Sequence, residues 1–128
     1  MQNQSLTKSP PTQPSKSTGI TENDVESDCI AWLKALGWRV DRNNRGLYYT
    51  PDGRKQMIGR KGQCDWRAVR RFGTEVQYFE FEAKSPTGSV SKEQAEYIAI
   101  LRHYRIPAWV VRSLDDLKVE LITEGFDG

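Results

Sequence analysis

The stretch VQYFEFEAK, residues 76–84, constrains the fold of this chain more than any other. Apolar and charged residues alternate along it, in the order Phe79, Glu80, Phe81, Glu82, Ala83, Lys84. Because successive side chains of a strand point to opposite faces, the pattern predicts one face in a core and two carboxylates with an ammonium on the other. Carboxylates on such a strand need a cross-strand cation, solvent or a metal ion as partner.

The remaining patterns predict a mixed α/β domain. Thr21 and Asp24 form a helix-start signature, and apolar residues at helical spacing follow until Gly37 ends the helix. Strands are expected at residues 38–42, 47–50, 64–69, 76–84 and 107–112, and further helices at 91–104 and 114–121. Turns are expected at 43–46, 51–54 and 71–74, and loops at 59–63 and 85–90.

The 128 residues are expected to form one domain over residues 20–128. Residues 1–19 are mainly Ser, Thr, Gln, Pro and Lys with a single Leu, a composition that predicts a disordered tail. The tail has no apolar segment typical of a secretory signal. No stretch approaches the roughly 18 apolar residues of a membrane span, so no membrane partner is expected.

Cysteine and histidine usage limits the kinds of site that one chain can build. Cys29 and Cys64 are the only cysteines and His103 is the only histidine. This excludes a Cys/His zinc site within one chain and any site that needs two histidines. Free thiols are expected, with a disulfide as the alternative, and His103 is expected to be solvated on a helix.

The formal net charge of +2 conceals a basic segment. Residues 39–71 hold ten Lys or Arg and three acids, a net +7, so the remainder carries −5. Such a segment favours a polyanionic partner, most often nucleic acid, although a solvated surface is the simpler alternative. The candidates for phosphate contacts are Arg42, Arg45, Arg60 and Lys61.

Asp65 extends the group of acids. It lies on the strand before Glu82, and a hairpin through residues 71–74 would bring it across from the far end of the Glu82 strand. Two carboxylates from adjacent strands with a lysine one step away make a candidate Mg²⁺ site, because Mg²⁺ takes oxygen ligands. A sheet face held by cross-strand salt bridges is the alternative.

Asp65 followed by Glu82-Ala83-Lys84 resembles the D…(D/E)-x-K signature of the PD-(D/E)XK nuclease superfamily. More specifically, residues 21–121 resemble the VRR-NUC domain, which is similar to archaeal Holliday-junction resolvases. The similar features are an acid on the first helix, GWRVDR after it, Gly62 three residues before the aspartate, the Ser91/Gln94 helix start, and PAWVV. One departure is Cys64, which stands where the family usually has proline.

The resemblance implies a restriction-endonuclease-like core, with a mixed β-sheet flanked by helices, and a set of site residues. It implies Asp65 and Glu82 as metal ligands, and Glu82 is preferred to Glu80 because only Glu82 stands two before a lysine. Lys84 would position or activate water. Glu26 would be the first-helix acid, with Glu22 as the alternative, and Gln94 would face the site, cap Ser91, or both. The implied cofactor is Mg²⁺, with Mn²⁺ as a substitute.

The function implied is a Mg²⁺-dependent DNA endonuclease of replication, recombination or repair, acting as a homodimer on branched DNA such as Holliday junctions. A cytoplasmic protein of bacterial or phage type is expected. The alternative is a non-catalytic DNA-binding module whose acidic cluster is structural. A sequence-specific restriction enzyme would need a readout element, and none is evident in so short a chain.

Overall fold

A computed structural model of the chain describes residues 19–43, 46–58 and 61–126, so the expected tail lies outside the described residues apart from Gly19. The elements are α1 (Glu22–Ala35), β1 (Arg39–Arg42), β2 (Gly46–Tyr49), β3 (Lys55–Ile58), β4 (Trp66–Phe72), β5 (Glu75–Ala83), α2 (Lys92–His103), β6 (Ala108–Val111) and α3 (Leu114–Glu124). The predicted mixed α/β class is confirmed.

A four-stranded mixed sheet in the order β1-β4-β5-β6 forms the centre of the molecule. β1, β4 and β5 are antiparallel neighbours, whereas β6 runs parallel to β5. A parallel pair needs a crossover connection, and α2 supplies it. In the β4–β5 hairpin Trp66 faces Phe81 and Phe72 faces Glu75.

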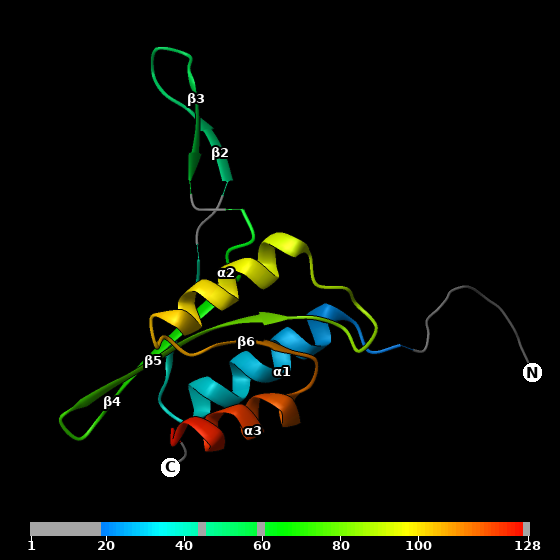
Figure 1. Cartoon of the computed structure of the whole chain (residues 1–128), viewed down its shortest axis with the longest axis vertical. Coiled ribbons are helices and arrows are strands. Elements are labelled where there is room, and N and C mark those ends of the chain that lie inside the picture. The colour runs from blue at the N-terminus through cyan, green and yellow to red at the C-terminus, as the bar shows by residue number, and fades with distance from the viewer. Residues whose placement is uncertain (1–18, 44–45, 59–60, 127–128) are drawn as a thin grey trace, which may run out of the picture.

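The two faces of the sheet are covered differently (Figure 1). α1 and α3 pack on one face, and their buried Leu33 and Leu121 meet Phe79, Phe81 and Trp109 of the sheet in the main core. α2 lies over the other face, which carries Glu80 and Glu82. No residue of α2 is buried, so this helix depends on polar contacts more than α1 does.

Side-chain caps explain where the helices begin. Thr21 and Asp24 exchange hydrogen bonds of 2.9 and 3.1 Å at the start of α1, as their spacing predicts. Ser91 and Gln94 do the same for α2. Ser113 caps α3, and this helix continues to Glu124, three residues beyond the predicted end.

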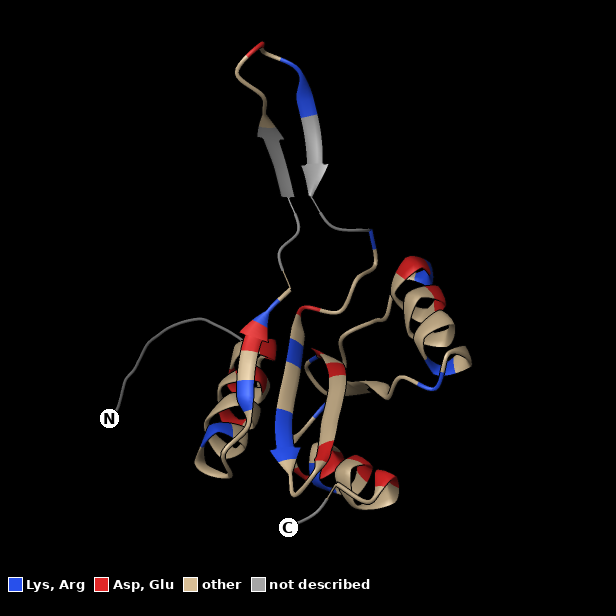
Figure 2. Cartoon of the chain, turned by 90° about the vertical axis from the view of Figure 1, so that its left-hand side faces the viewer, with Lys and Arg blue, Asp and Glu red and all other residues tan. Residues whose placement is uncertain are grey.

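The chain between β1 and β4 differs from its prediction. β3 was not anticipated, and β4 continues to Phe72, so the predicted turn at 71–74 narrows to Gly73 and Thr74. β2 and β3 form a separate two-stranded antiparallel sheet. We call residues 46–58 the arm; it stands away from the four-stranded sheet and its helices (Figures 1 and 2).

Candidate metal centre

Asp65 and Glu82 face each other at one end of the β4–β5 hairpin. The register that pairs Trp66 with Phe81 places Asp65, one residue earlier, opposite Glu82. The Asp65 N–H donates to Oε1 of Glu82 at 3.1 Å, and the Asp65 carbonyl accepts the N–H of Asn43 at 2.8 Å. The predicted position of Asp65 across from Glu82 is confirmed.

The Glu82 carboxyl lies in surroundings that disfavour its charge. Its side chain is buried, with 3% exposed. Burial raises the pKa of Glu82 to about 8; the charge of Asp65 and a side-chain hydrogen bond with it act in the same direction, and Lys84 acts against them. The carboxyl groups of Asp65 and Glu82 therefore repel each other when both are ionised, and a bound cation would reduce this repulsion.

Acids from α1 approach Asp65 from the helix side. Glu22, Glu26 and Asp65 each offer a carboxylate oxygen within 4.8 Å of the other two. Glu26 is half-buried; its Oε2 accepts the indole N–H of Trp66 at 2.7 Å, and its Oε1 lies 3.7 Å from an Arg42 nitrogen. Both candidates for the helix acid thus reach Asp65, and Glu26 is the one held in place.

Lys84 lies one residue beyond β5, on the same face as Glu82 by strand alternation. Its N–H donates to the carbonyl of Val111 at 3.0 Å, which continues the pairing with β6. Its side chain is half-buried and forms no ion pair with any residue that the structure describes. Lys84 is thus near enough to Glu82 to lower its pKa without forming an ion pair, so its ammonium group can still contact a substrate or water.

The acid groups match Mg²⁺ or Mn²⁺ in the kind of donor atom that they offer. All are carboxylate oxygens, the ligands that these hard cations prefer. Neighbouring ligands in an octahedron of about 2.1 Å radius are about 3 Å apart and opposite ligands about 4.2 Å apart. The oxygens of Glu22, Glu26 and Asp65 lie within 4.8 Å of one another, a looser spacing than this, and this group does not include Glu82.

Gln94 and Glu80 have other partners. The side-chain oxygen of Gln94 accepts the Ser91 N–H at 3.0 Å, which is the capping role that its spacing allowed. Glu80 accepts three side-chain hydrogen bonds, from Asn43 at 3.0 Å, Tyr97 at 2.8 Å and Tyr78 at 2.7 Å. Among the described contacts, neither residue joins the acid group.

Asn43 and Arg112 support the site without any sequence signal. Asn43 donates its side-chain N–H to the Cys64 carbonyl at 2.9 Å as well as to Glu80, so it ties the residue before Asp65 to β5. Arg112 donates to the carbonyls of Ser85 at 2.8 Å and Gly88 at 2.6 Å. It therefore holds the loop that follows Lys84.

The basic segment is only partly available for a polyanion. Arg70 is buried, donating to Gln77 at 2.8 Å and to the Phe126 carbonyl, so it does not belong to the surface. Arg42 stacks on Trp66, and Lys61 pairs with Glu93 at 3.7 Å. The other two candidates for phosphate contacts, Arg45 and Arg60, lie outside the described residues.

The four acids and Lys84 follow one another along the chain in the order on which the resemblance to nuclease domains is based. That resemblance stays a prediction.

None of the helices within residues 19–43, 46–58 and 61–126 has the length and apolar character needed to cross a membrane. Comparison of the chain with protein-family models, curated protein sequences and solved structures finds no match.

Proposed function

We propose that this chain is a magnesium-dependent endodeoxyribonuclease with a restriction-endonuclease-like core of the VRR-NUC type. The observation that carries the proposal is the meeting of Asp65 with Glu82 and with the α1 acids, beside Lys84, which acts on the Glu82 carboxyl without forming an ion pair among the described residues. Carboxylates and an ammonium in this arrangement suit the hydrolysis of a phosphodiester.

Each residue has a role in this reaction. Asp65, Glu82 and Glu26, with Glu22 as the alternative to Glu26, would hold Mg²⁺, and Mn²⁺ would suit the same oxygens. When bound, the metal ion supplies positive charge that stabilises the charge developing on the phosphate. Lys84 would hold the attacking water through its ammonium group and orient it toward phosphorus.

The substrate we propose is branched DNA, such as a four-way junction, cut during replication, recombination or repair. The resemblance to junction resolvases supports this choice. One acid group per chain also requires two chains for paired cuts, and symmetric dimers are the commonest assembly. We therefore propose a homodimer.

A second candidate is a non-catalytic DNA-binding module, and the contacts of the acids favour it. Oε2 of Glu26 accepts from Trp66, Oε1 of Glu26 faces Arg42, and Oε1 of Glu82 accepts the Asp65 N–H. In this alternative the acids hold α1 and the hairpin together, and no metal ion is needed.

A cleavage assay separates the two candidates. Purified protein is incubated with four-way junction, flap, single-stranded and linear DNA, with magnesium or with chelator. For the nuclease, magnesium produces cleavage, and Lys84→Ala lowers the rate about a hundredfold, the size expected when the group that positions a reactant is lost, while DNA binding is retained. Lys92→Ala, at an exposed lysine on α2, is the matched control and keeps the wild-type rate. Binding without cleavage on every substrate identifies the second candidate.

A further inference from the structure

The arm joins the rest of the molecule beside the acid group. On the β1 side, Asn43 donates its N–H to the Asp65 carbonyl at 2.8 Å and its side chain to the Cys64 carbonyl and Glu80. The chain re-enters through Gly62, three residues before Asp65. Asn43 and Gly62, where the two connections of the arm meet the sheet, therefore both lie near Asp65. Asp65 is the candidate ligand that contacts Glu82 and also lies near the α1 acids.

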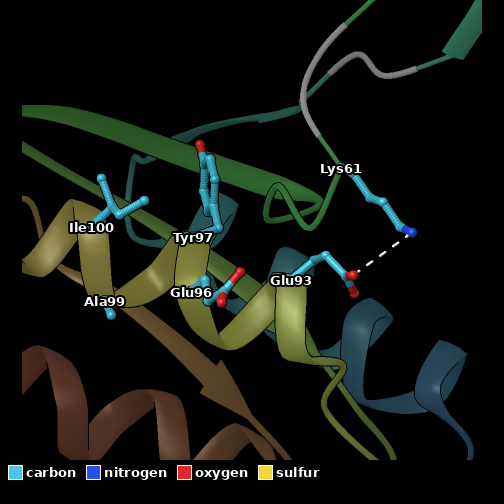
Figure 3. Close-up of a pocket in the computed structure, with 6 residues that line it drawn as sticks. All are labelled: Lys61, Glu93, Glu96, Tyr97, Ala99 and Ile100. Carbon is cyan, nitrogen blue, oxygen red and sulfur yellow. Dashed lines mark ion pairs between the residues drawn. The ribbon is translucent and has the colours of Figure 1, made fainter.

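The second connection is also packed against α2. A Cβ atom at Gly62 would lie 2.3 Å from the carbonyl oxygen of Glu93, so only glycine allows this approach. Lys61 points across to Glu93, with 3.7 Å between the charged atoms, at the rim of a hollow of about 490 Å³ beside α2 (Figure 3). Lys61 and Gly62 are thus held against α2.

The arm itself presents polar groups to solvent. Thr50 and Arg54 bond to each other through backbone N–H and carbonyl at 2.8 Å, and Arg54 pairs with Asp52 at 3.0 Å, which orders the tip. Tyr49 is 63% exposed, and Lys55 forms no ion pair with any described residue. Within the arm, residues 46–58, the cations are Arg54 and Lys55 and the acid is Asp52.

The dimensions of the arm suit a groove of duplex DNA. Each strand has four residues, which at about 3.4 Å per residue gives a ribbon about 13 Å long. The major groove of B-DNA is about 12 Å wide and about 8.5 Å deep, and it admits a two-stranded ribbon. A ribbon of this length can enter the groove while cations near its tip stay within reach of the phosphates along the groove edges.

We propose that the arm binds the double-stranded DNA that flanks the phosphodiester at the acid group, by entering its major groove. The inference rests on the proposed function and adds the form of nucleic acid that is recognised. Arg54 and Lys55 contact phosphates, and the connections at Asn43 and Gly62 set the position of the duplex relative to Asp65.

The test compares charge-matched variants of the full chain by fluorescence anisotropy, with calcium in place of magnesium to measure binding without cleavage. Arg54→Ala with Lys55→Ala removes two cations from the arm. Arg39→Ala with Arg71→Ala removes two exposed cations from the opposite end of the sheet. The ligands are linear duplex, four-way junction and single-stranded DNA of equal length. Unfolding temperatures confirm that each variant is folded.

The arm variant is expected to bind duplex and junction about tenfold more weakly than the control variant does. Its slope of log affinity against log salt should fall by about 2, one for each lost phosphate contact. Binding of single-stranded DNA should change equally in both variants. Equal losses on duplex, or a loss confined to single strands or to junctions, would overturn the proposal.

Failure of the inference is distinguishable from failure of the proposed function. If the wild type does not cleave DNA and is not stabilised by magnesium, while the arm variant loses duplex binding, the arm assignment stands and the nuclease assignment fails. If the arm variant binds and cuts duplex like the wild type, the nuclease assignment stands and the arm assignment is wrong.

Discussion

Glu80 and Glu82 share one face of β5 and are both buried, yet their surroundings are opposite. Glu80 accepts hydrogen bonds from the Asn43 amide and from the phenols of Tyr78 and Tyr97. Burial, and then Glu80 itself, raises the pKa of each phenol, so both phenols remain protonated donors. Glu82 has one backbone N–H and a second carboxyl beside it. The sequence distinguished Glu80 from Glu82 only by their distance to Lys84. The structure adds a physical difference, because Glu80 has three side-chain donors and Glu82 has one backbone N–H.

The first prediction concerns Glu82→Gln and the pH dependence of stability without metal. The pKa of Glu82, about 8 in the folded chain, lies above its ordinary value of 4.5. The folded chain therefore holds the proton more tightly. The contribution of Glu82 to stability is complete below about pH 4.5 and is lost as the pH rises through about 8. In chelator, wild-type stability should fall over this range, and Glu82→Gln should flatten the profile and raise the unfolding temperature above pH 8.

Magnesium provides the matching control. A ligand at about 100 times its Kd stabilises the state that binds it by about 2.7 kcal/mol. Millimolar magnesium should therefore raise the unfolding temperature of the wild type above pH 8 and leave Glu82→Gln almost unchanged. If Glu82→Gln is destabilised and both proteins ignore magnesium, the acids form a salt-bridged structural cluster.

Gly62 allows a second prediction, because Gly37 offers a matched control. Both glycines have positive φ, +84° and +91° respectively, but a Cβ at Gly37 would meet nothing within 4 Å. Gly37→Ala should cost about 1–2 kcal/mol of unfolding free energy, the price of a left-handed conformation. Gly62→Ala should cost about 1–3 kcal/mol more, because the Glu93 backbone must move. Equal costs in denaturant unfolding would show that the approach to α2 is loose.

At the scale of elements, short sequence patterns predicted those features that depend on residues close together in the chain. The Thr21 and Ser91 caps predicted the starts of α1 and α2, and the alternation along β5 predicted the longest strand. β3 was missed because the residues between Arg54 and Gly59 carry no alternating apolar pattern, and their pairing with β2 depends on the tip. The contacts of Asn43 and Arg112 join segments distant in sequence, so no local pattern could reveal them.

The candidate site was predictable to a similar degree. Asp65 and Glu82 could be placed together because a hairpin fixes cross-strand neighbours. The sequence favoured Glu26 over Glu22 as the helix acid, but which of them reaches Asp65 depends on how α1 packs against β4. In the structure both acids reach Asp65, and the hydrogen bond from Trp66 holds Glu26.

α2 supports a third prediction, since it contains no buried residue. Its Tyr97 donates to Glu80 at 2.8 Å, and hydrogen bonds to charged groups contribute about 1.5–3 kcal/mol. Tyr97→Phe should lower the unfolding free energy by about this amount. Tyr104→Phe, at a side chain that is 70% exposed, should change it by less than about 0.5 kcal/mol. Denaturant unfolding measures both, and similar values would mean that α2 is held by its apolar contacts.

At the scale of the whole molecule, the chain consists of two parts with unequal support. The four-stranded sheet shares a buried core with α1 and α3, whereas β2 and β3 pair only with each other in the described residues. A two-stranded hairpin alone is marginally stable in water. The arm should therefore open at a free energy well below that of global unfolding.

Hydrogen exchange measured by mass spectrometry tests this division. Amides of β4 and β5, within the core, should exchange only through global unfolding, whereas amides of the arm should exchange by local opening and many times faster. Duplex DNA added with calcium should slow exchange in the arm and leave α3, on the opposite face of the sheet from Glu82, unchanged. Single-stranded DNA is the control and should leave the arm unprotected. Arm amides that are already as slow as those of β5 in the free protein would show that the arm packs on the body, and the ribbon would then not be free to enter a groove.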